Sequence, residues 1–500
     1  MTEPVPAPPE TSGRIIARNS AWLLGSNLLG KVLTVVFLAV AANRLEADAY
    51  GKFQFVLALG GFFHIALDWG YATLMIERGS KDRGDLARHY SGNLGLRTLT
   101  YPSSLLLYAA AVAALGASGL GAGMFRADLP TMGIFLLAFG VVIVHGHFYL
   151  QRGALMALER FSPIAAGETT ERVVFFALGL AALFAFGSLG PFLLVCLLAP
   201  LAKCLVLEAA LRRAGMRGSW RPDGAFLRRH WRDALPHALY AVAGMLMYRV
   251  DQVMIGLIRG SAEVGLYSVA YDKVFGLVLL GQMVSNALTP TASRNFAADR
   301  GEFQRIFRRA FFLLPVLAMP MTAGLALTAP GVMDLFHTDE YSGAWRALAW
   351  LSPFILFRFW SFLYAAVLLA AGRIKYHLYA ESLGVAVKIA MNLALVPEHG
   401  YLGAAVSVAV AELVVLLADA WFAKRIGLPF LPLGDCAAPA AATALMALGV
   451  WLAAPLGVFA QVGVGGALYA AGALAFRIHR REPAIGRALA AIPFVGAFFR

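Results

Sequence analysis

Charged residues are scarce in this sequence. Asp, Glu, Lys and Arg make up only 14% of its 500 residues, and hydrophobic residues make up 60%, whereas soluble proteins carry about 25% charged residues. Apolar runs of about 20 residues, each long enough to cross roughly 30 Å of hydrocarbon, recur from end to end. This composition excludes an ordinary soluble domain and predicts an all-α, polytopic membrane protein. The net charge of +13 is therefore not interpreted as a sign of nucleic-acid binding.

Cysteine is equally sparse. The three cysteines, Cys196, Cys204 and Cys436, show neither paired spacing nor neighbouring histidines, which argues against both disulfides and a zinc site. The segment "VIVHGHFYLQRG" contains His145 and His147, but side chains two positions apart on a helix diverge. No metal site is therefore predicted, and the cysteines are interpreted as small buried residues. Proton coupling through either histidine stays open.

The sequence also lacks the signatures of catalysis. It contains no P-loop, HExxH helix or GxSxG elbow. No cofactor and no nucleotide-driven pump is predicted, so any energy must come from a gradient or a partner. The longest predicted outer loop, near residues 337–345, is too short to house a catalytic domain. These absences argue against an enzyme.

What the sequence does contain is a regular succession of apolar segments. Lys and Arg gather in every second connection between them, and residues 212–233 alone contain seven. Because basic loops stay on the cytoplasmic side of a membrane, both termini are predicted to be cytoplasmic. Fourteen spans are predicted, at residues 19–42, 50–76, 91–115, 131–151, 164–187, 190–211, 234–258, 265–289, 310–333, 345–372, 374–396, 400–423, 436–454 and 457–476.

Two halves of six spans each are indicated. After an outer loop, "EADAYGKFQFVLAL" (46–59) and "GSAEVGLYSVAYDK" (260–273) share an acidic residue, a glycine and then an aromatic residue. Both segments open the second span of a half, which indicates parallel repeats related by an axis along the membrane normal. The predicted divisions are a disordered cytoplasmic tail (1–18), a six-helix bundle (19–211), a basic linker (212–233), a second six-helix bundle (234–423), two peripheral helices (436–476) and an interfacial tail (477–500).

Ionisable residues deep inside the predicted spans are the strongest functional signal. Each costs about 2.5–3.5 kcal/mol near the bilayer centre. Most of them should therefore face one another or a wet cavity rather than lipid. The deepest are Lys31, Arg249, Asp251, Arg358, Lys388 and Glu412.

Arg249 and Lys273 are predicted to lie at nearly the same depth. Arg249 is roughly 21 Å from the inner start of its helix, and Lys273 is roughly 12 Å from the outer start of the next. Asp251 lies about 200° around the helix from Arg249, so these two side chains diverge, and Asp272 can neutralise only one of the two cations. Two interpretations stay open: a static network of ion pairs that includes Asp251 and Asp272, or a cationic patch for an anionic substrate.

A second polar stripe follows the eleventh predicted span, where Glu381, Lys388 and Asn392 share one face. Glu412 and Asp419 share a face of the next span. Because consecutive spans run antiparallel, we expect Lys388 and Glu412 to form a structural ion pair between the two helices.

Two stretches resemble segments of a known family: "DQVMIGLIRGSAEVGLYSVAYDK" (251–273) and "NLALVPEHGYLGAAVSVAVAEL" (392–413). Residues 19–55 are similar to the opening helices of the same family. The sequence is identified as a member of the polysaccharide-transporter flippases, within the multidrug/oligosaccharidyl-lipid/polysaccharide exporter superfamily. The resemblance covers about twelve of the fourteen spans. It implies two six-helix bundles around a central cavity, with two added C-terminal helices.

The resemblance also implies a function. It points to a flippase for undecaprenyl-diphosphate-linked oligosaccharides in O-antigen, capsule or exopolysaccharide synthesis, acting by alternating access in the bacterial inner membrane. Membrane lipids, a polysaccharide polymerase and glycosyltransferases are the implied partners. The family lines its cavity partly from helices 1, 2, 7 and 8, which by span position implies Lys31, Arg249 and Lys273 as substrate-binding residues. Arg358 is a fourth candidate.

Two other functions stay open within the same superfamily. A cation-coupled multidrug exporter would favour acidic residues in its cavity, whereas cations outnumber them in the N-terminal half. A flippase for the peptidoglycan precursor would share the need for buried cations, because its substrate also carries a diphosphate that must leave water.

Overall fold

The computed structural model describes residues 11–79, 83–118 and 129–478. Within these ranges the chain is almost entirely helical and contains no β-strand. Ten of the described helices are long and apolar enough to cross a membrane. The predicted all-α, polytopic membrane protein is thereby confirmed.

The helices differ widely in length. Three short 3₁₀ helices, Asp339–Tyr341, Leu433–Cys436 and Ala454–Leu456, lie in the connections. The α-helices are α1 (Thr11–Asp68), α2 (Tyr71–Gly79), α3 (Arg83–Ser118), α4 (Leu129–Ala157), α5 (Phe161–Ala185), α6 (Leu189–Arg213), α7 (Gly224–Arg259), α8 (Ser261–Ala298), α9 (Arg300–Phe336), α10 (Ala344–Leu351), α11 (Pro353–Ala370), α12 (Ile374–Lys424), α13 (Ala437–Leu452) and α14 (Val458–Ala475).

The two longest helices each contain two of the predicted spans. Glu46 in α1 and Gly400 in α12 have φ angles of 64° and 56°, so each helix breaks there and resumes in a new direction. Conversely, α10 and α11 together form the span predicted at 345–372, and the span predicted at 50–76 is divided between α1 and α2. Each predicted span therefore corresponds to a helical segment of the structure.

Carboxylates from other elements cap both breaks. The Ala47 N–H donates to Glu340 Oε1 at 2.9 Å, and the Tyr401 N–H donates to Glu263 Oε2 at 2.9 Å. The first N–H groups of a helix have no partner inside it, and a negative charge there is favoured by the helix dipole. Contacts between distant segments thus fix where the long helices bend.

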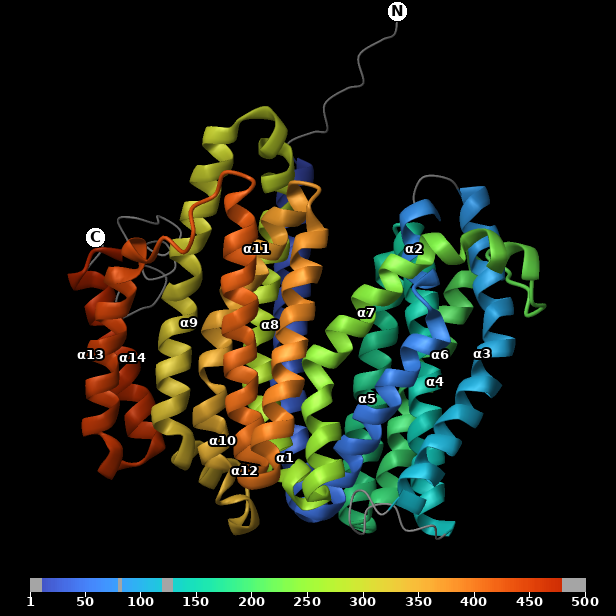
Figure 1. Cartoon of the computed structure of the whole chain (residues 1–500), viewed down its shortest axis with the longest axis horizontal. Coiled ribbons are helices and arrows are strands. Elements are labelled where there is room, and N and C mark those ends of the chain that lie inside the picture. Colours follow the sequence, from blue (N-terminus) through green and yellow to red (C-terminus); the bar gives the residue numbers. More distant parts are fainter. Residues whose placement is uncertain (1–10, 80–82, 119–128, 479–500) are drawn as a thin grey trace, which may run out of the picture.

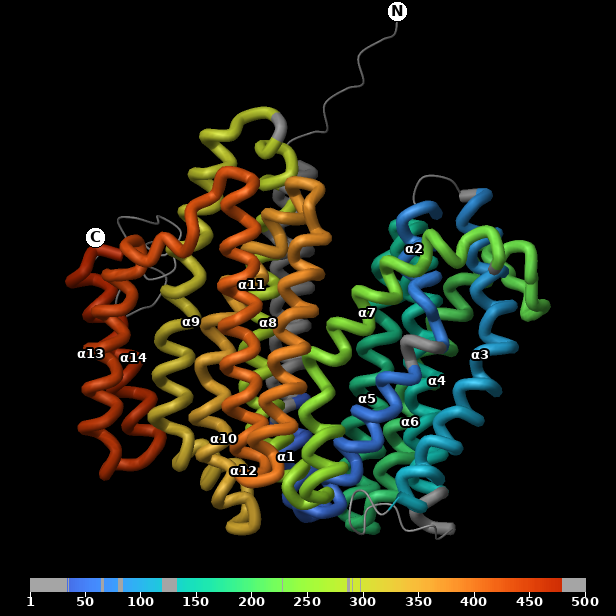
Figure 2. Tube along the Cα trace, in the orientation of Figure 1, coloured from blue at the N-terminus to red at the C-terminus, as the bar shows by residue number. Residues whose placement is uncertain are grey.

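The helices form two lobes, which lie close together at the lower end of Figure 1 and diverge toward the upper end. The first lobe contains the second part of α1 and helices α2–α6, and the second lobe contains α8–α12 (Figures 1 and 2). Helix α7 contacts both lobes, and the pair α13 and α14 packs on α9 at the outer edge of the second lobe.

At the lower end, helices α1 and α8 cross through a reciprocal contact of two glycines. A Cβ on Gly51 would lie 1.8 Å from the Ser261 carbonyl oxygen, and a Cβ on Gly265 would lie 2.2 Å from the Ala47 carbonyl oxygen. Only glycine permits such an approach of two backbones. We call this contact between Gly51 and Gly265 the glycine clasp.

The glycine clasp joins equivalent positions of the two repeated segments. Gly51 is the sixth residue of the segment that starts at Glu46, and Gly265 is the sixth residue of the segment that starts at Gly260. Both starting residues have positive φ angles, of 64° and 94°. Reciprocal contact of equivalent residues is the property of a two-fold interface, here between two halves of one chain.

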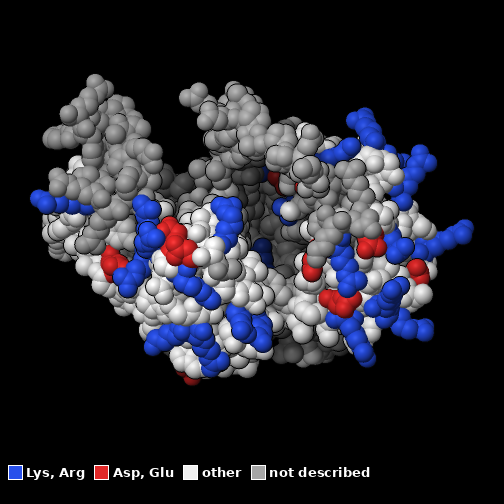
Figure 3. All heavy atoms as spheres, turned by 90° about the horizontal axis from the view of Figure 1, so that it is seen from above, with Lys and Arg blue, Asp and Glu red and all other residues white. Residues whose placement is uncertain are grey.

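The upper face is strongly basic and hollow. Figure 3 shows Lys and Arg side chains scattered over both lobes and a hollow between them. The connection between α6 and α7, which lies within the predicted basic linker, is at this upper end (Figure 1). The lobes are therefore joined at one end of the spans and separated at the other.

Candidate substrate cavity

A cavity of about 490 Å³ lies between the lobes. Most of its lining is apolar, and its charged or titratable side chains come from α4 and α7. This volume lies within the range of about 300–1,000 Å³ that is usual for ligand pockets. The lining residues are Leu57, Gly61, Val141, Val142, His145, Tyr149, Ala241, Gly244, Met245, Tyr248, Arg249 and Phe275.

Arg249 is the only Lys or Arg among these lining residues. Its Nη1 donates a hydrogen bond to Gln252 Oε1 at 3.0 Å, and Gln252 Nε2 in turn donates to Ser268 Oγ at 3.0 Å. Gln252 is completely buried. Among the side chains that the structure describes, no carboxylate forms an ion pair with Arg249. Its guanidinium is thus hydrogen-bonded to a neutral partner, and the Asp272 carboxylate attracts it without forming an ion pair.

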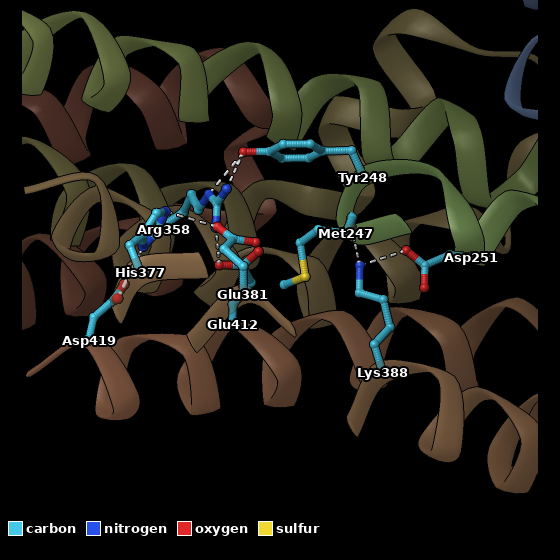
Figure 4. Close-up of polar contacts among 9 residues, drawn as sticks. All are labelled: Met247, Tyr248, Asp251, Arg358, His377, Glu381, Lys388, Glu412 and Asp419. Atoms are coloured by element: carbon cyan, nitrogen blue, oxygen red, sulfur yellow. Dashed lines mark hydrogen bonds and ion pairs between the residues drawn. The ribbon is translucent and has the colours of Figure 1, made fainter. Parts of the chain in front are cut away.

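Asp251 points away from Arg249, as the two-residue spacing predicts. Its carboxylate accepts hydrogen bonds from Lys388 Nζ at 2.9 Å, Asn392 Nδ2 at 2.8 Å and Tyr267 Oη at 3.3 Å. Figure 4 shows the Lys388 ammonium next to the Asp251 carboxylate, and each of these side chains is 1% exposed. Lys388 therefore clamps α12 to α7 through Asp251, rather than pairing with Glu412 as expected.

Arg358 of α11 is enclosed in the second lobe. Its Nη1 lies 2.6 Å from Glu381 Oε1 and 3.3 Å from Glu412 Oε2. Its Nε also donates to Tyr248 Oη at 3.0 Å (Figure 4). Arg358 was predicted as a substrate-binding residue from its depth alone, and in this structure its charge is matched by two carboxylates.

His377 extends the same cluster toward the upper end of α12. Its Nδ1 lies 3.0 Å from both carboxylate oxygens of Asp419, and its Nε2 lies 3.4 Å from Glu381 Oε1. All three side chains are buried. His377 was not among the residues predicted from the sequence. Its position one turn before Glu381 could have indicated that it belongs to the same polar face of the helix.

A second cavity, of about 350 Å³, lies on the other side of α7. It shares Ala241, Gly244 and Tyr248 with the first cavity and is also lined by Arg358 and Glu381. Tyr248 therefore stands between the two cavities, with its hydroxyl bound to Arg358.

Lys273 lies apart from the cavity that Arg249 lines. Its Nζ donates to the Val269 carbonyl oxygen at 3.1 Å and contacts His337 Nε2, just beyond the end of α9. Burial, and then the charge of Lys273, lower the pKa of His337 to about 3, so this imidazole is neutral and can accept a hydrogen bond from the ammonium. The structure therefore does not bring Lys273 next to Arg249.

Asp272 faces the first lobe rather than Lys273. Its Oδ2 accepts hydrogen bonds from Tyr50 Oη at 2.8 Å and Gln54 Nε2 at 3.0 Å. These bonds cross from α8 to α1 close to the glycine clasp. Lys31 belongs to α1, but its side chain lies outside those that the structure describes. The substrate-binding roles of Lys31, Lys273 and Arg358 remain predictions.

The first lobe contains a smaller cavity, of about 300 Å³, which shares Leu57, Val141 and His145 with the one that Arg249 lines. Glu171 lies in its wall and forms an ion pair with the buried Lys203 at 2.6 Å. His145 Nε2 is 3.9 Å from Glu171 Oε1. Within the described ranges, no cluster of three or more His, Cys, Asp or Glu side chains is arranged to hold a metal ion.

A helical membrane-spanning fold with two lobes and a cavity between them is compatible with a membrane transporter, and the comparisons with known proteins support that class. A family described as polysaccharide biosynthesis protein matches residues 16–296, more than half of the chain, and the MatE family matches residues 236–394. The chain therefore belongs to the polysaccharide biosynthesis protein family.

Curated relatives share little sequence identity with this chain, and the length of the shared region differs between them. The teichuronic acid biosynthesis protein TuaB of Bacillus subtilis (strain 168) is 23% identical over 400 residues, which cover 77% of each chain. The amylovoran biosynthesis protein AmsL of Erwinia amylovora is 21% identical over 221 residues, which cover 43% of this chain and 57% of the relative.

Solved structures show the same fold. The lipid II flippase MurJ in an inward closed conformation superposes with a TM-score of 0.71 at 13% identity, covering 91% of this chain and 99% of the other. An inward-facing multidrug resistance MATE family transporter gives 0.59 at 14% identity, covering 80% and 94%. The family and these neighbours are transporters and flippases rather than enzymes.

Proposed function

We propose that this protein is a flippase that moves undecaprenyl-diphosphate-linked oligosaccharide repeat units across the bacterial inner membrane for surface polysaccharide synthesis. The observation that supports this most is Arg249, a membrane-embedded cation in the wall of the cavity between the lobes that forms no ion pair with a described carboxylate. The membership of the chain in the polysaccharide biosynthesis protein family supports a polysaccharide precursor as the substrate.

Arg249 suits a lipid diphosphate for electrostatic reasons. A diphosphate loses its hydration when it enters a membrane cavity, and a guanidinium can replace that hydration with two parallel hydrogen bonds. The interaction is strong because the dielectric constant around it is low. Gln252 orients the guanidinium without neutralising it, so the binding energy is available to the substrate.

Transport would proceed by alternating access. We propose that the two lobes rock against each other about the linker at 212–233, with both termini in the cytoplasm. In the structure the lobes are separated at the upper end and joined at the glycine clasp (Figure 1). The basic upper face would then be cytoplasmic, where membrane glycosyltransferases complete the substrate. Release on the other side, toward a polymerase, would require the glycine clasp to open.

A cation-coupled multidrug exporter fits this cavity less well. Such a transporter needs an acidic side chain to attract its cationic substrate, and no Asp or Glu is among the residues that line the cavity with Arg249. A flippase for the peptidoglycan precursor uses the same cationic chemistry, so cellular phenotype rather than cavity chemistry separates it from our proposal.

The test is to replace Arg249 in cells that depend on this protein for a surface polysaccharide. Arg249→Ala is expected to lower surface glycan at least about tenfold, because hydrogen bonds to charged groups contribute about 1.5–3 kcal/mol, while the amount of protein in the membrane stays normal. Arg229→Ala, which removes an exposed arginine from the same helix, is the matched control. Wild-type glycan with Arg249→Ala would overturn the proposal, and a cell-wall defect with normal glycan would indicate the peptidoglycan precursor instead.

A further inference from the structure

A separate cavity of about 500 Å³ lies in the second lobe, outside the space between the lobes. It is formed where α8 ends and α9 begins, where α11 passes into α12, and where α12 ends. These ends meet at the upper side of the molecule (Figure 1). We call it the arginine cavity, and its lining residues are Phe296, Arg300, Gln304, Ala371, Arg373, Tyr376, Arg425, Ile426 and Gly427.

Three arginines converge on the arginine cavity without a counter-charge. Arg300, Arg373 and Arg425 are 52 to 125 positions apart in the sequence, and no acidic side chain is among the lining residues. The two acidic residues beside Arg300 are engaged elsewhere. Asp299 caps α9 through the Glu302 N–H at 3.0 Å, and Glu302 pairs with Arg305 at 2.8 Å.

Aromatic rings hold two of these guanidiniums in place. Arg300 lies over the ring of Phe296 at 3.7 Å, and Arg425 lies 4.5 Å from the ring of Trp421. Gln304 Nε2 donates to the Gly427 carbonyl oxygen at 2.9 Å, which fixes the wall between α9 and the end of α12. A guanidinium stacked on a ring keeps its N–H donors free at its edge, so the cavity is organised in advance for an anion with several oxygens.

The position of the arginine cavity favours a lipid as the source of that anion. It lies at the ends of membrane-spanning helices, the depth at which lipid phosphates are found. Large exposed side chains flank it: Trp421 is 50% exposed and Phe430 is 40% exposed. Exposed Trp and aromatic residues at helix ends are typical of the interface between hydrocarbon and headgroups.

We propose that the arginine cavity binds the phosphate of an anionic membrane lipid, at a site separate from the transport path. This goes beyond a general attraction of basic loops to anionic membranes, because it assigns the binding to three arginines from three different connections. It also gives the cytoplasmic end of the second lobe an anchor in the lipid headgroup layer while the lobes rock.

The test compares lipid binding by matched variants of the full-length protein. Purified protein would be titrated with phosphatidylglycerol or phosphatidylcholine and analysed by native mass spectrometry, with inorganic pyrophosphate in a parallel titration. The variant combines Arg300→Gln, Arg373→Gln and Arg425→Gln. The control is Arg308→Gln, which removes an exposed arginine of α9 that does not line the cavity.

The wild-type protein and the control are expected to retain phosphatidylglycerol over phosphatidylcholine. The triple variant is expected to bind phosphatidylglycerol at least about tenfold more weakly, because charge-assisted hydrogen bonds are lost, while its elution on gel filtration stays normal. Equal phosphatidylglycerol binding by the triple variant and the control would overturn the proposal. Tighter binding of free pyrophosphate than of phosphatidylglycerol would overturn the lipid assignment. If the triple variant aggregates, Arg373→Gln alone is compared with Arg308→Gln, and equal binding by those two overturns the proposal as well.

Discussion

Arg249 and Arg358 offer a direct comparison, because both are arginines deep in predicted membrane spans and they lie on opposite sides of Tyr248. Arg358 is bound by two carboxylates and by the Tyr248 hydroxyl, and it is 3% exposed. Arg249 lines the cavity between the lobes and has the amide of Gln252 as its described side-chain partner. Depth in the membrane is therefore a poor guide to function by itself, and the charge of the neighbours separates the two roles.

The difference has an energetic reason. A buried ion pair stabilises a fold little compared with apolar residues of the same shape, but the loss of one partner leaves an uncompensated charge and costs about 3–5 kcal/mol. The cluster around Arg358 is consequently sensitive to every single substitution. Arg249 forms no ion pair with a described carboxylate, although that of Asp272 attracts it, so its removal should cost less folding stability than removal of Arg358.

The largest effect is expected from Arg358→Met. It would leave Glu381 and Glu412 buried without their cation, and the free energy of unfolding should fall by about 3–5 kcal/mol. Arg249→Met should change it by less than about 1 kcal/mol. Thermal unfolding of both purified variants measures the contrast, and equal unfolding temperatures would remove the distinction between the two arginines.

A somewhat smaller effect is expected at the ion pair between α7 and α12. Lys388→Met should cost about 3 kcal/mol because Asp251 loses its counter-ion. Adding Asp251→Asn should recover part of that loss. The Asn amide has nearly the same shape as the Asp carboxylate, carries no charge and can still accept a hydrogen bond. The double-mutant cycle reports the coupling, and additive effects would contradict the pairing seen in Figure 4.

The glycine clasp allows a similar comparison between Gly51 and Gly265, which occupy equivalent positions in the two halves of the chain. Gly51→Ala and Gly265→Ala should each force α1 and α8 apart, at a cost of about 1–3 kcal/mol. Because the contact is reciprocal, we expect the two variants to have similar effects and the double variant to have less than their sum. Gly463→Ala is the control, since a Cβ there meets nothing within 4 Å.

Separation of the lobes at the glycine clasp can be measured directly. Phe186, just after the end of α5, and Glu398, beside the break in α12, are exposed, and spin labels at these two positions would report the distance between the lobes. Both glycine variants should lengthen this distance relative to the control. An unchanged distance would mean that the clasp does not hold the lower end closed.

The apolar segments predicted the spans well because the bilayer dictates their length and composition. The two breaks, at Glu46 and Gly400, also fall at the predicted outer ends of spans. Pairing of charges was harder to predict. Lys388 and Glu412 lie on consecutive spans, but the break at Gly400 sets how these helices rotate against each other, and Lys388 meets Asp251 instead.

The sequence also could not separate Arg249 from Lys273. Their predicted depths agree, but depth does not specify which way a side chain points around its helix. Lys273 turns toward His337 and the end of α9, while Arg249 turns toward the cavity. The direction depends on the crossing of α1 and α8 at the glycine clasp, and Gly51, its α1 member, lies far along the chain from both residues.

The last prediction concerns the pH dependence of stability at Lys273, whose partner is a neutral imidazole. The pKa of His337 is lowered to about 3, against roughly 6.5 in the unfolded chain, so the unfolded state binds more protons between these values. Stability should therefore fall as pH drops from about 6.5 toward 3, by at most about 1.4 kcal/mol per pH unit from this group. His337→Gln, which keeps an acceptor for Lys273 but cannot be protonated, should flatten that part of the stability profile. Thermal unfolding of wild type and variant between pH 4 and 7 measures it, and parallel profiles would show that Lys273 does not depend on a neutral imidazole.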